Sequence, residues 1–441
     1  MRLMSIIRSK SFWLLDNLKG GYVRNAYSTI SNIDHRDSND RYVIDYQNSA
    51  WKALRNHAVS ETSYYKKYSE EMDLDAFPIV TKNDFKNDQD SFLSSNYRKE
   101  KLVQMSTSGS TGTPFVSYQN ATKKKWVNAE VIFYSEKVGY RLGENLSYIR
   151  TVVKQNKKSG LKQFLQNQTL INCGLLNDEG IESLLKVLQK KSRKGDITLL
   201  GYGSTYKLIS DYLKRNNIKT IKELSITGGI SGSDLLFDDV RTKIEELFGG
   251  SRLVSRYSNE ENGIIGQDDS INNVFEINEA SYIVEIVDDN GKSVPDGVIG
   301  HIVVTDLYNY AMPMIRYDTG DMGAIEYIEN RGRTKRCIGS FSGRKVDMIY
   351  DAKGNPISPH TITNYMWDYT DVKQFQVIQN DKSKYVIKLN VDESFSREDD
   401  LINTYKNLFG LTASIDIEYV DEIPVLNSGK RRYIINNYKK A

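Results

Sequence analysis

Hydrophobic and polar residues follow three successive patterns along the 441-residue chain. Residues 1 to about 100 place apolar side chains at helical spacing, most clearly over 42–54, so mostly helices are expected there. From about 120 to 260, short apolar runs alternate with amphipathic stretches, which predicts a parallel sheet covered by helices. From about 270, strand patterns follow one another, and a hairpin is expected to pair 282–287 with 300–305.

The C-terminal part of the chain mixes both patterns on a smaller scale. Strands are expected at 346–350, 375–379, 385–389 and 414–419, and helices at 359–367 and 397–408, which is a unit of split-βαβ type. A chain of this length is too long for one core. We therefore predict an α/β protein. It has a large N-terminal α/β domain with a β-rich subdomain over residues 1–342, and a small C-terminal α+β domain over 343–441.

Residues 5–15 form an apolar stretch that Arg8 and Lys10 interrupt. A signal peptide needs a longer uninterrupted apolar core, and no run approaches the length that spans a membrane. An amphipathic helix is expected instead. Its apolar face is predicted to pack on its own domain, and contact of residues 1–20 with a membrane surface is the alternative.

Composition excludes several classes of protein. The formal net charge of +3 gives no sign of a nucleic-acid-binding face, and the run at Lys123, Lys124 and Lys125 is interpreted as a solvated helix face. The two cysteines are far apart in sequence and the four histidines lack metal-ligand spacing, so neither a disulfide framework nor a zinc site is expected. These observations favour a cytoplasmic protein, and they leave open whether it forms a homodimer.

The loop at 106–114 carries the most informative polar pattern. It combines hydroxyl side chains with two glycines and no charge, between strands expected at 101–105 and 115–118. Glycine lets backbone N–H groups converge on one point, and hydroxyls add further donors, which suits a triphosphate. The loop lacks the Gly-Lys-Ser/Thr ending of a Walker motif. Taken by itself, it also fits a solvated Ser/Thr turn.

A second glycine-rich stretch, 227–232, is expected at the carboxyl end of a strand. Ligands of parallel sheets gather at such ends. Backbone without side chains would let a flat ring lie against it. This stretch is therefore a candidate for the surface that holds an aromatic base.

Two acid-bearing segments follow predicted strands. Residues 257–261 end in adjacent acids, Glu260 and Glu261, and a carboxylate beside a triphosphate can hold Mg²⁺. Residues 317–321 are expected to form a turn with two carboxylates, one of which can accept hydrogen bonds from both ribose hydroxyls. Each segment alone also fits an acidic surface turn.

Two basic residues complete the candidate set. Arg344 lies at the expected domain junction, where its guanidinium could reach a ribose or a phosphate. Lys430 follows Gly429 in the tail and could enter another domain's cleft as a mobile point charge. In isolation, the tail also fits a solvated basic segment.

These segments occur in an order that resembles a known family. The 106–114 loop is followed by Tyr257-x-x-x-Glu261, Tyr317-x-Thr-Gly-Asp321, Gly343-Arg344-x-x-Asp347-x-Ile349 and Pro424-x₄-Gly429-Lys430. In this order they resemble the adenylate-forming superfamily of acyl- and aryl-CoA ligases, luciferases and adenylation domains. The length, the compact tail and residues 77–85 make the chain similar to phenylacetate–CoA ligase-like proteins, in particular their capsular-polysaccharide (CapK) branch. The resemblance spans roughly residues 75 to 435.

The resemblance implies a role for each matching residue. Glu261 would hold Mg²⁺, Asp321 would bind the ribose with help from Arg344, and Lys430 would bridge the carboxylate and the α-phosphate. The phosphate loop would comprise Ser106, Thr107, Ser108, Gly109, Ser110, Thr111 and Gly112. The base would be held by Gly228, Gly229, Ile230 and Tyr257, with the two glycines lining the adenine pocket and Tyr257 stacking nearby. Residues 345–347 would be the hinge of the small domain.

Three positions depart from the family pattern. The lysine usual near the end of the phosphate loop is absent, since Thr113 follows Gly112, so the phosphate charge must be met elsewhere. Ser258 replaces a glycine and Glu260 a hydroxyl residue in the tyrosine motif, which leaves open which acid takes the metal. Asp318 replaces an arginine.

The resemblance predicts an enzyme that uses ATP and Mg²⁺ to activate a small carboxylic acid as an acyl-adenylate. The acyl group would then pass to coenzyme A, or to an amine or hydroxyl of a sugar intermediate in surface polysaccharide biosynthesis. Two alternatives stay open. One is an ATP- or AMP-binding protein without ligase activity, in an assembly or regulatory role, and the other is a scaffold for capsule assembly on the membrane surface.

Overall fold

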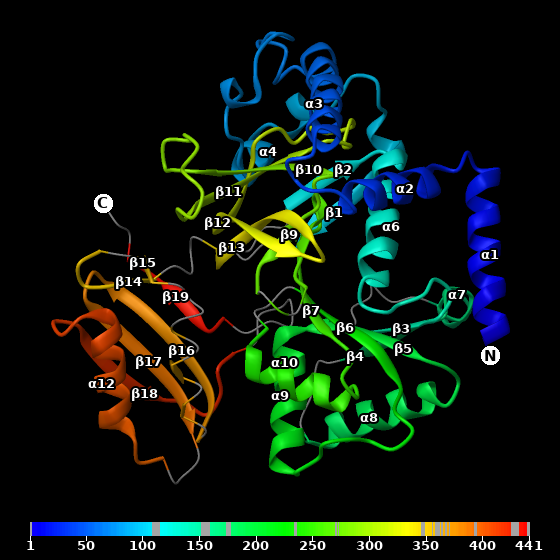
Figure 1. The fold of residues 1–441 in the computed structure, drawn as a ribbon. Coiled ribbons are helices and arrows are strands. Elements are labelled where there is room, and N and C mark those ends of the chain that lie inside the picture. Colours follow the sequence, from blue (N-terminus) through cyan, green and yellow to red (C-terminus); the bar gives the residue numbers. More distant parts are fainter. Residues whose placement is uncertain are drawn as a thin grey trace.

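The computed structural model of the chain is shown in Figure 1. It describes residues 2–107, 115–150, 159–172, 178–232, 236–269, 271, 273–344, 349–354, 356–357, 362, 365–366, 368–369, 371–391, 395–424 and 432–438. The predicted phosphate-loop residues 108–112, Cys173 and Lys430 lie outside these ranges.

The N-terminal part is helical, as predicted. The helices are α1 (Arg2–Leu18), α2 (Tyr22–Asp34), α3 (Arg41–Glu61), η1 (Leu74–Ala76), α4 (Lys82–Asn87), α5 (Gln89–Phe92) and η2 (Lys99–Lys101). Helix α4 begins with a capping box: the Thr81 side chain accepts from the backbone N–H of Asp84, and the Asp84 carboxylate accepts from the N–H of Thr81. The prediction that the apolar face of the first helix packs on its own domain holds for Phe12 and Trp13, which pack against a buried cluster. It is wrong for Leu3, Leu14 and Leu18, which are exposed.

A two-stranded hairpin and a long helix follow. Strands β1 (Val103–Thr107) and β2 (Phe115–Gln119) pair antiparallel, with Thr107 opposite Phe115, so they flank the predicted phosphate loop as expected. Helix α6 (Ala121–Glu136) buries Trp126, Ala129 and Phe133 on one side.

The centre of the molecule is a mixed sheet of eleven strands in the order β10-β11-β12-β13-β9-β8-β7-β6-β5-β3-β4. Its parallel half consists of β3 (Asn145–Arg150), β4 (Gln168–Asn172), β5 (Ile197–Tyr202), β6 (Ile226–Gly232) and β7 (Leu253–Asn259). The helices in this region are α7 (Gly160–Gln166), α8 (Asp178–Ser192), α9 (Gly203–Arg215) and α10 (Asp238–Leu247). Side chains of α8, α9 and α10 share one core with this half of the sheet, which confirms the predicted helix-covered parallel sheet.

The strand-rich part of the chain continues the same sheet. It comprises β8 (Gly263–Gln267), β9 (Phe275–Ile277), β10 (Tyr282–Val287), β11 (Gly300–Asp306), β12 (Tyr317–Asn330) and β13 (Arg333–Arg344). All their pairings are antiparallel, and the predicted β10–β11 hairpin is confirmed. The change from parallel to antiparallel occurs at the β7–β8 pair.

A separate core forms near the C-terminus. It involves β14 (Ile349–Tyr350), β15 (Pro356–Ile357), β16 (Val372–Asp381), β17 (Lys384–Val391), α12 (Glu398–Phe409), β18 (Ser414–Tyr419) and β19 (Ile434–Asn436). Four of these strands form one sheet in the order β18-β17-β16-β19, in which only the central pair is antiparallel. The buried residues of this core all lie between 349 and 434. The α+β character is as predicted, and the two-domain division at 342 stays a prediction.

Glu279 is buried where the segment between α2 and α3 meets the sheet. Its carboxylate accepts a 2.7 Å hydrogen bond from the Ser38 hydroxyl, and burial raises its pKa to about 7. Between pH 4.5 and 7 the folded protein therefore binds more protons at this site than the unfolded chain, so stability increases as the pH falls through this window.

We expect Glu279→Gln to remove this pH dependence. Urea denaturation should show that the variant is more stable than the wild type at pH 8, by up to about 3 kcal/mol, and equally stable near pH 5. Glu70, which is exposed, supplies the control as Glu70→Gln. An unchanged difference between pH 5 and pH 8 in Glu279→Gln would contradict the assignment.

Candidate functional site

Glu261 is a buried carboxylate in the turn between β7 and β8. Its Oε1 accepts a 2.9 Å hydrogen bond from the Tyr317 hydroxyl and lies 2.7 Å from the ammonium of Lys82. Its Oε2 has no hydrogen-bond partner among the described residues, although it is buried. The neighbouring Glu260 is exposed. Of the two acids in this turn, Glu261 is therefore the one held in place with a coordinating oxygen to spare.

Lys82 reaches Glu261 because the segment before α4 pairs with the first residues of β12. The N–H of Val80 donates to the carbonyl of Arg316, and the N–H of Asp318 donates to the carbonyl of Val80. These bonds place Lys82, the first residue of α4, beside Tyr317. Its ammonium also lies 5.8 Å from the ring centroid of Phe115, the first residue of β2. The local sequence pattern around Lys82 does not identify it as a site residue. The absence of a lysine from the phosphate loop was the signal to search for one elsewhere.

Asp321 and Tyr257 form the second polar pair of the site. The Tyr257 hydroxyl donates a 2.8 Å hydrogen bond to Asp321 Oδ2, and Asp321 lies opposite Arg344 across the β12–β13 ladder. The prediction of a turn at 317–321 is wrong: these residues begin strand β12, whose pairing with β11 shifts register nearby, and Gly320 has a positive φ of 78°. An irregular strand thus presents the two acids that were expected from a turn.

Both tyrosines are neutral hydrogen-bond donors at physiological pH. Burial, followed by the nearby Asp321, raises the pKa of Tyr257 well above its ordinary value. Burial and Glu261 do the same for the pKa of Tyr317. Glu261 also raises the pKa of Tyr257, and Asp321 that of Tyr317, so both acids lie within electrostatic reach of both hydroxyls.

The structure brings several of the predicted site residues together. The side-chain amide of Gln119, at the end of β2, donates a 3.0 Å hydrogen bond to the carbonyl of Glu261. The hairpin that flanks the predicted phosphate loop is therefore joined to the acid-bearing turn. Ser106 and Thr107 lie in β1, at the edge of this arrangement. Their phosphate-binding role stays a prediction, as do those of 108–112 and Lys430.

The glycines at 228–232 occupy a different place from the one predicted. They lie inside strand β6 rather than beyond its carboxyl end. A Cβ on Gly228 would stand 1.9 Å from the carbonyl oxygen of Val138, and one on Gly229 would stand 2.7 Å from both Leu253 and Phe248. Close packing therefore accounts for both glycines. Ile230 is fully buried, and a role of these residues in binding adenine stays a prediction.

A buried charged network supports the Glu261 turn from behind. Lys123 is completely buried, and its ammonium lies 2.8 Å from the carboxylate of Asp306 and 3.2 Å from the Tyr282 hydroxyl. That hydroxyl donates to the carbonyl of Asn262, the residue after Glu261. The prediction that Lys123 lies on a solvated face is wrong. The lysine faces inward, where it pairs with the buried carboxylate of Asp306.

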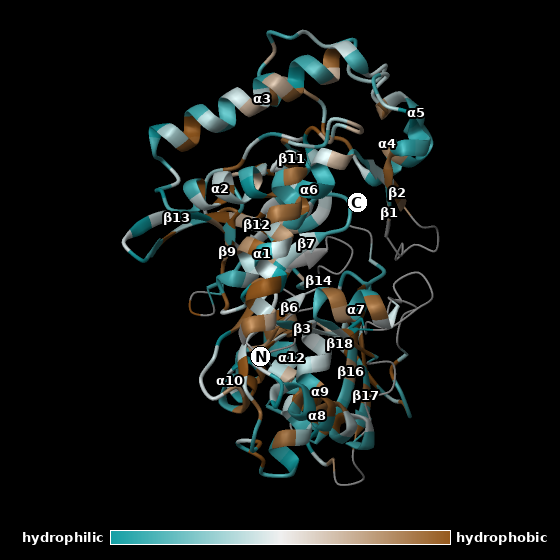
Figure 2. Ribbon diagram, turned by 90° about the vertical axis from the view of Figure 1, so that its right-hand side faces the viewer, coloured by the Kyte–Doolittle hydropathy of each residue, from teal (hydrophilic) through white to brown (hydrophobic). Residues whose placement is uncertain are grey.

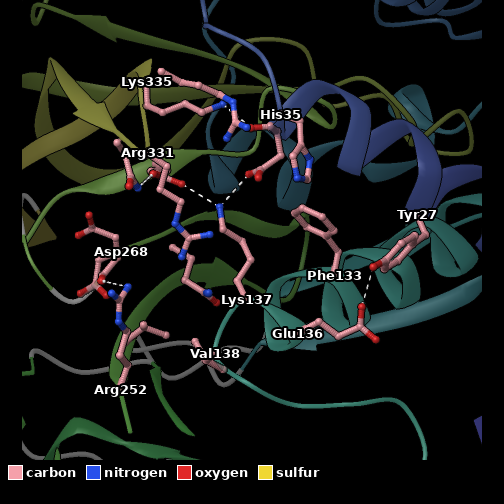
Figure 3. A pocket seen from close by; sticks show the side chains of 17 residues that line it. Tyr27, His35, Phe133, Glu136, Lys137, Val138, Arg252, Asp268, Arg331 and Lys335 are labelled. Atoms are coloured by element: carbon pink, nitrogen blue, oxygen red, sulfur yellow. Dashed lines mark hydrogen bonds and ion pairs between the residues drawn. The ribbon is translucent and has the colours of Figure 1, made fainter. Parts of the chain in front are cut away.

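A cavity of about 210 Å³ lies at the ends of β7 and β12 that are opposite to Glu261 and Asp321 (Figure 3). It is lined by the start of β7 and the tip of the β12–β13 hairpin, including Arg252 and Arg331, and by none of the predicted nucleotide-site residues. The Lys137 ammonium lies 2.8 Å from both Asp34 and Glu276 across it. Because Lys137, Asp34 and Glu276 bond to one another across it, we interpret it as a structural feature.

The donor set around Glu261 fits a magnesium ion that is delivered with a nucleotide. Among the described residues, no three or more His, Cys, Asp or Glu side chains are grouped so that they could hold a metal ion by themselves. Mg²⁺ typically takes one or two protein carboxylates and completes its shell with water and phosphate oxygens. The vacant Oε2 of Glu261 is a ligand of that kind.

The chain is similar to known proteins in both its C-terminal part and its full length. Residues 349–437 match the family model described as the CapK C-terminal domain. The chain is 27% identical to protein CapK of Staphylococcus aureus, over 99% of this chain and 97% of that protein. It is also 27% identical to a phenylacetate-coenzyme A ligase of Pseudomonas putida, over 63% of this chain and 62% of that enzyme.

Solved structures share the fold at low sequence identity. A 2-hydroxyisobutyryl-CoA ligase in the postadenylation state, in complex with 2-HIB-AMP, superimposes with a TM-score of 0.68 at 15% identity, over 90% of this chain and 89% of that chain. ATP-bound MatB from Rhodopseudomonas palustris gives a TM-score of 0.54 at 16% identity, over 77% and 68%. The chain is therefore similar to CapK along its whole length and to phenylacetate-coenzyme A ligases over part of it, and it shares its fold with solved acyl-CoA ligases.

Proposed function

We propose that the protein is an AMP-forming acid ligase. It activates a carboxylic acid with ATP, releases pyrophosphate and transfers the acyl group from the resulting acyl-adenylate to an acceptor. The observation that carries this proposal is the buried carboxylate of Glu261, which has one vacant oxygen and lies beside Lys82 and the β1–β2 hairpin. Similarity to phenylacetate-coenzyme A ligases supports the same reaction class.

Each polar group of the site would bind a different part of the nucleotide. Asp321, held by the Tyr257 hydroxyl, would accept hydrogen bonds from the ribose, with Arg344 opposite it. The hydroxyl- and glycine-rich loop would bind the β- and γ-phosphates. Residues 228–230 would border the base, with Tyr257 near it. Glu261 would hold Mg²⁺, which neutralises phosphate charge when bound.

Lys82 is proposed to supply the positive charge that the phosphate loop lacks. It is the cation that lies between Glu261 and the ring of Phe115, directly beside the strand that leaves the loop. About a third of its side chain is exposed, so the ammonium can exchange Glu261 for a phosphate oxygen. A flexible lysine is suited to this task because it binds phosphate as a point charge.

The reaction needs positioning more than covalent chemistry from the protein. The substrate carboxylate attacks the α-phosphorus, a mixed anhydride forms, and the bond to pyrophosphate breaks. Negative charge accumulates on the α-phosphate oxygens as this occurs. Lys430 is proposed to stabilise that charge from the small domain, with residues 345–347 as the hinge.

The acceptor is proposed to be coenzyme A, the substrate named for the phenylacetate-coenzyme A ligases. An amine or hydroxyl of a sugar intermediate is the alternative, and it corresponds to a place in capsular or surface polysaccharide biosynthesis. A homodimer is a further proposal that neither acceptor requires.

ATP–pyrophosphate exchange measured across a panel of carboxylic acids tests the reaction class. We expect exchange with at least one acid, and we expect Lys430→Ala to lower it by about 10²-fold, as for loss of one electrostatic stabiliser of a transition state. Thioester formation with coenzyme A, compared with acyl transfer to amino sugars, then identifies the acceptor. ATP binding by calorimetry without exchange on any acid would favour the ligase-inactive alternative. Exchange that Lys430→Ala leaves unchanged would remove this lysine from its role.

A further inference from the structure

The apolar face of α1 points away from the protein. Its exposed apolar side chains, with exposed fractions between 46% and 76%, are Leu3, Met4, Ile6, Ile7, Leu14, Leu15 and Leu18. At 3.6 residues per turn, residues 3, 7, 14 and 18 form one stripe along the helix. The opposite stripe, residues 5, 9, 12 and 16, faces the protein and contains two serines and an aspartate beside Phe12, which packs with Trp13 against a buried cluster. Seven apolar side chains of α1 are thus exposed, whereas a surface helix usually buries its apolar face.

Specific contacts fix α1 in this orientation. The carboxylate of Asp16 accepts hydrogen bonds from the backbone N–H groups of Val23 and Arg24 at the start of α2. Trp13 packs edge-on against Tyr27 of α2, with ring centroids 5.8 Å apart. A Cβ on Gly143 would stand 2.3 Å from the carbonyl oxygen of Ser5, so the helix backbone lies directly on the loop before β3. Rolling the apolar stripe inward would break all of these contacts.

Helix α7 extends the same apolar surface. Leu161, Phe164 and Leu165 are each more than 60% exposed. The guanidinium of Arg8 on α1 donates to the carbonyl of Phe164 at 3.3 Å and lies 5.4 Å from the centroid of its ring. The two helices therefore adjoin, as Figure 1 shows at its right-hand edge, and Figure 2 shows α1 with brown, hydrophobic segments on the face turned to the viewer. We call this surface, formed by the exposed apolar residues of α1 and α7, the α1–α7 face.

The charged side chains within residues 1–15 and 159–167, the segments that carry the α1–α7 face, have one sign. Arg8 and Lys10 flank the apolar stripe of α1, and Lys162 lies on α7. Residues 1–15 and 159–167 contain no aspartate or glutamate. A second copy docked by a twofold axis would bring the same cations together with no acid from these segments to neutralise them. An anionic surface would instead neutralise them while the apolar side chains left water.

We propose that the α1–α7 face docks on an anionic lipid bilayer. Helix α1 lies in the plane of the interface, with its leucines and isoleucines among the acyl chains and its basic residues at the headgroups. This mode does not require a spanning segment, and in the described part of the chain no helix has the length and apolarity to cross a bilayer. The proposal is independent of the ligase activity and would place the enzyme next to an acceptor carried by the membrane.

Vesicle co-sedimentation of the purified full-length chain tests this proposal. We expect the protein to pellet with vesicles that contain phosphatidylglycerol and to bind vesicles of phosphatidylcholine alone more weakly. High salt should weaken the binding without abolishing it, because apolar insertion remains. Ile7→Asp combined with Leu14→Asp should lower the partition coefficient by at least about tenfold, and Phe164→Asp should lower it less.

Leu411→Asp is the matched control, because Leu411 is 82% exposed in the turn after α12, far from α1 in the sequence. All variants change exposed residues, so each should keep the thermal unfolding transition of the wild type. The proposal is overturned if the wild type does not pellet with anionic vesicles, or if Ile7→Asp with Leu14→Asp pellets as well as Leu411→Asp does. A wild-type dimer that the double variant dissociates, without vesicle binding, would assign the face to a second copy instead.

Discussion

Glu261→Gln is expected to lower ATP–pyrophosphate exchange by about 10²- to 10³-fold, the range typical for loss of one preorganised charge in an active site. The amide keeps an oxygen for the Tyr317 hydroxyl but loses the negative charge that would bind Mg²⁺ and that now pairs with Lys82. Glutamine is nearly isosteric with glutamate, so the turn between β7 and β8 should stay folded. The rate of exchange at saturating acid and its dependence on Mg²⁺ concentration are the measurements.

The adjacent acid gives the matched control. Glu260 differs from Glu261 by one position and by exposure, so Glu260→Gln should leave exchange within about twofold of the wild type if burial and fixed geometry select the metal ligand. A large loss in Glu260→Gln with a small one in Glu261→Gln would reverse the assignment. Equal, small losses in both would remove the acid-bearing turn from the reaction.

Asp306→Asn is expected to lower the free energy of unfolding by about 3–5 kcal/mol, the cost of leaving one member of a buried ion pair without its partner. Both side chains of the pair are completely buried, and the Lys123 ammonium lies 2.8 Å from Asp306 Oδ2 and 2.9 Å from Oδ1. The asparagine would leave the ammonium with the Tyr282 hydroxyl, the face of that ring at 4.8 Å and the electrostatic interaction with the buried Glu130. Urea denaturation followed by tryptophan fluorescence measures the loss, since Trp126 lies on the same helix.

Two further variants separate charge from packing. Combining Asp306→Asn with Lys123→Met removes both charges and should recover a large part of the lost stability, because a neutral, well-filled site is often as stable as a buried pair. Asp45→Asn breaks the exposed Arg41–Asp45 pair and should cost less than about 0.5 kcal/mol. If Asp306→Asn costs no more than Asp45→Asn, the pair does not stabilise the fold.

Sequence patterns predicted a helix or strand correctly where residues close together in the chain are sufficient to form it. The hydroxyl of Thr81 and the carboxylate of Asp84 are three residues apart, and together they are sufficient to start α4. The alternation over 120–260 likewise predicted the parallel half of the sheet. The strand-rich part from 270 was expected as a separate subdomain, whereas its strands extend the same sheet. The β7–β8 pairing that joins the two parts depends on contacts that periodicity does not report.

For other residues, contacts with parts of the chain far away in sequence determine whether the side chain is buried and what it touches. Lys123 has the same charge as its two neighbours, and only the position of Asp306, far along the chain, shows that it is buried. The glycines at 228 and 229 lie inside β6, where the carbonyl of Val138 and the ring of Phe248 leave no room for a Cβ, and their role in binding adenine stays a prediction. For the candidate site, the motifs identified Glu261, Asp321 and Tyr257, whose contacts the structure now describes. Lys82 became visible only through the pairing of Val80 with β12.

The contact between Lys82 and Glu261 bears on the order in which ligands arrive. A carboxylate oxygen that already faces an ammonium at 2.7 Å gives a free divalent cation a repulsive neighbour. A triphosphate reverses this, because its oxygens attract the ammonium away from the acid while they bring the divalent cation with them. On the proposed function, the protein without nucleotide would bind the free ion weakly and would take up the ion together with the nucleotide, as Lys82 moves from Glu261 to a phosphate oxygen.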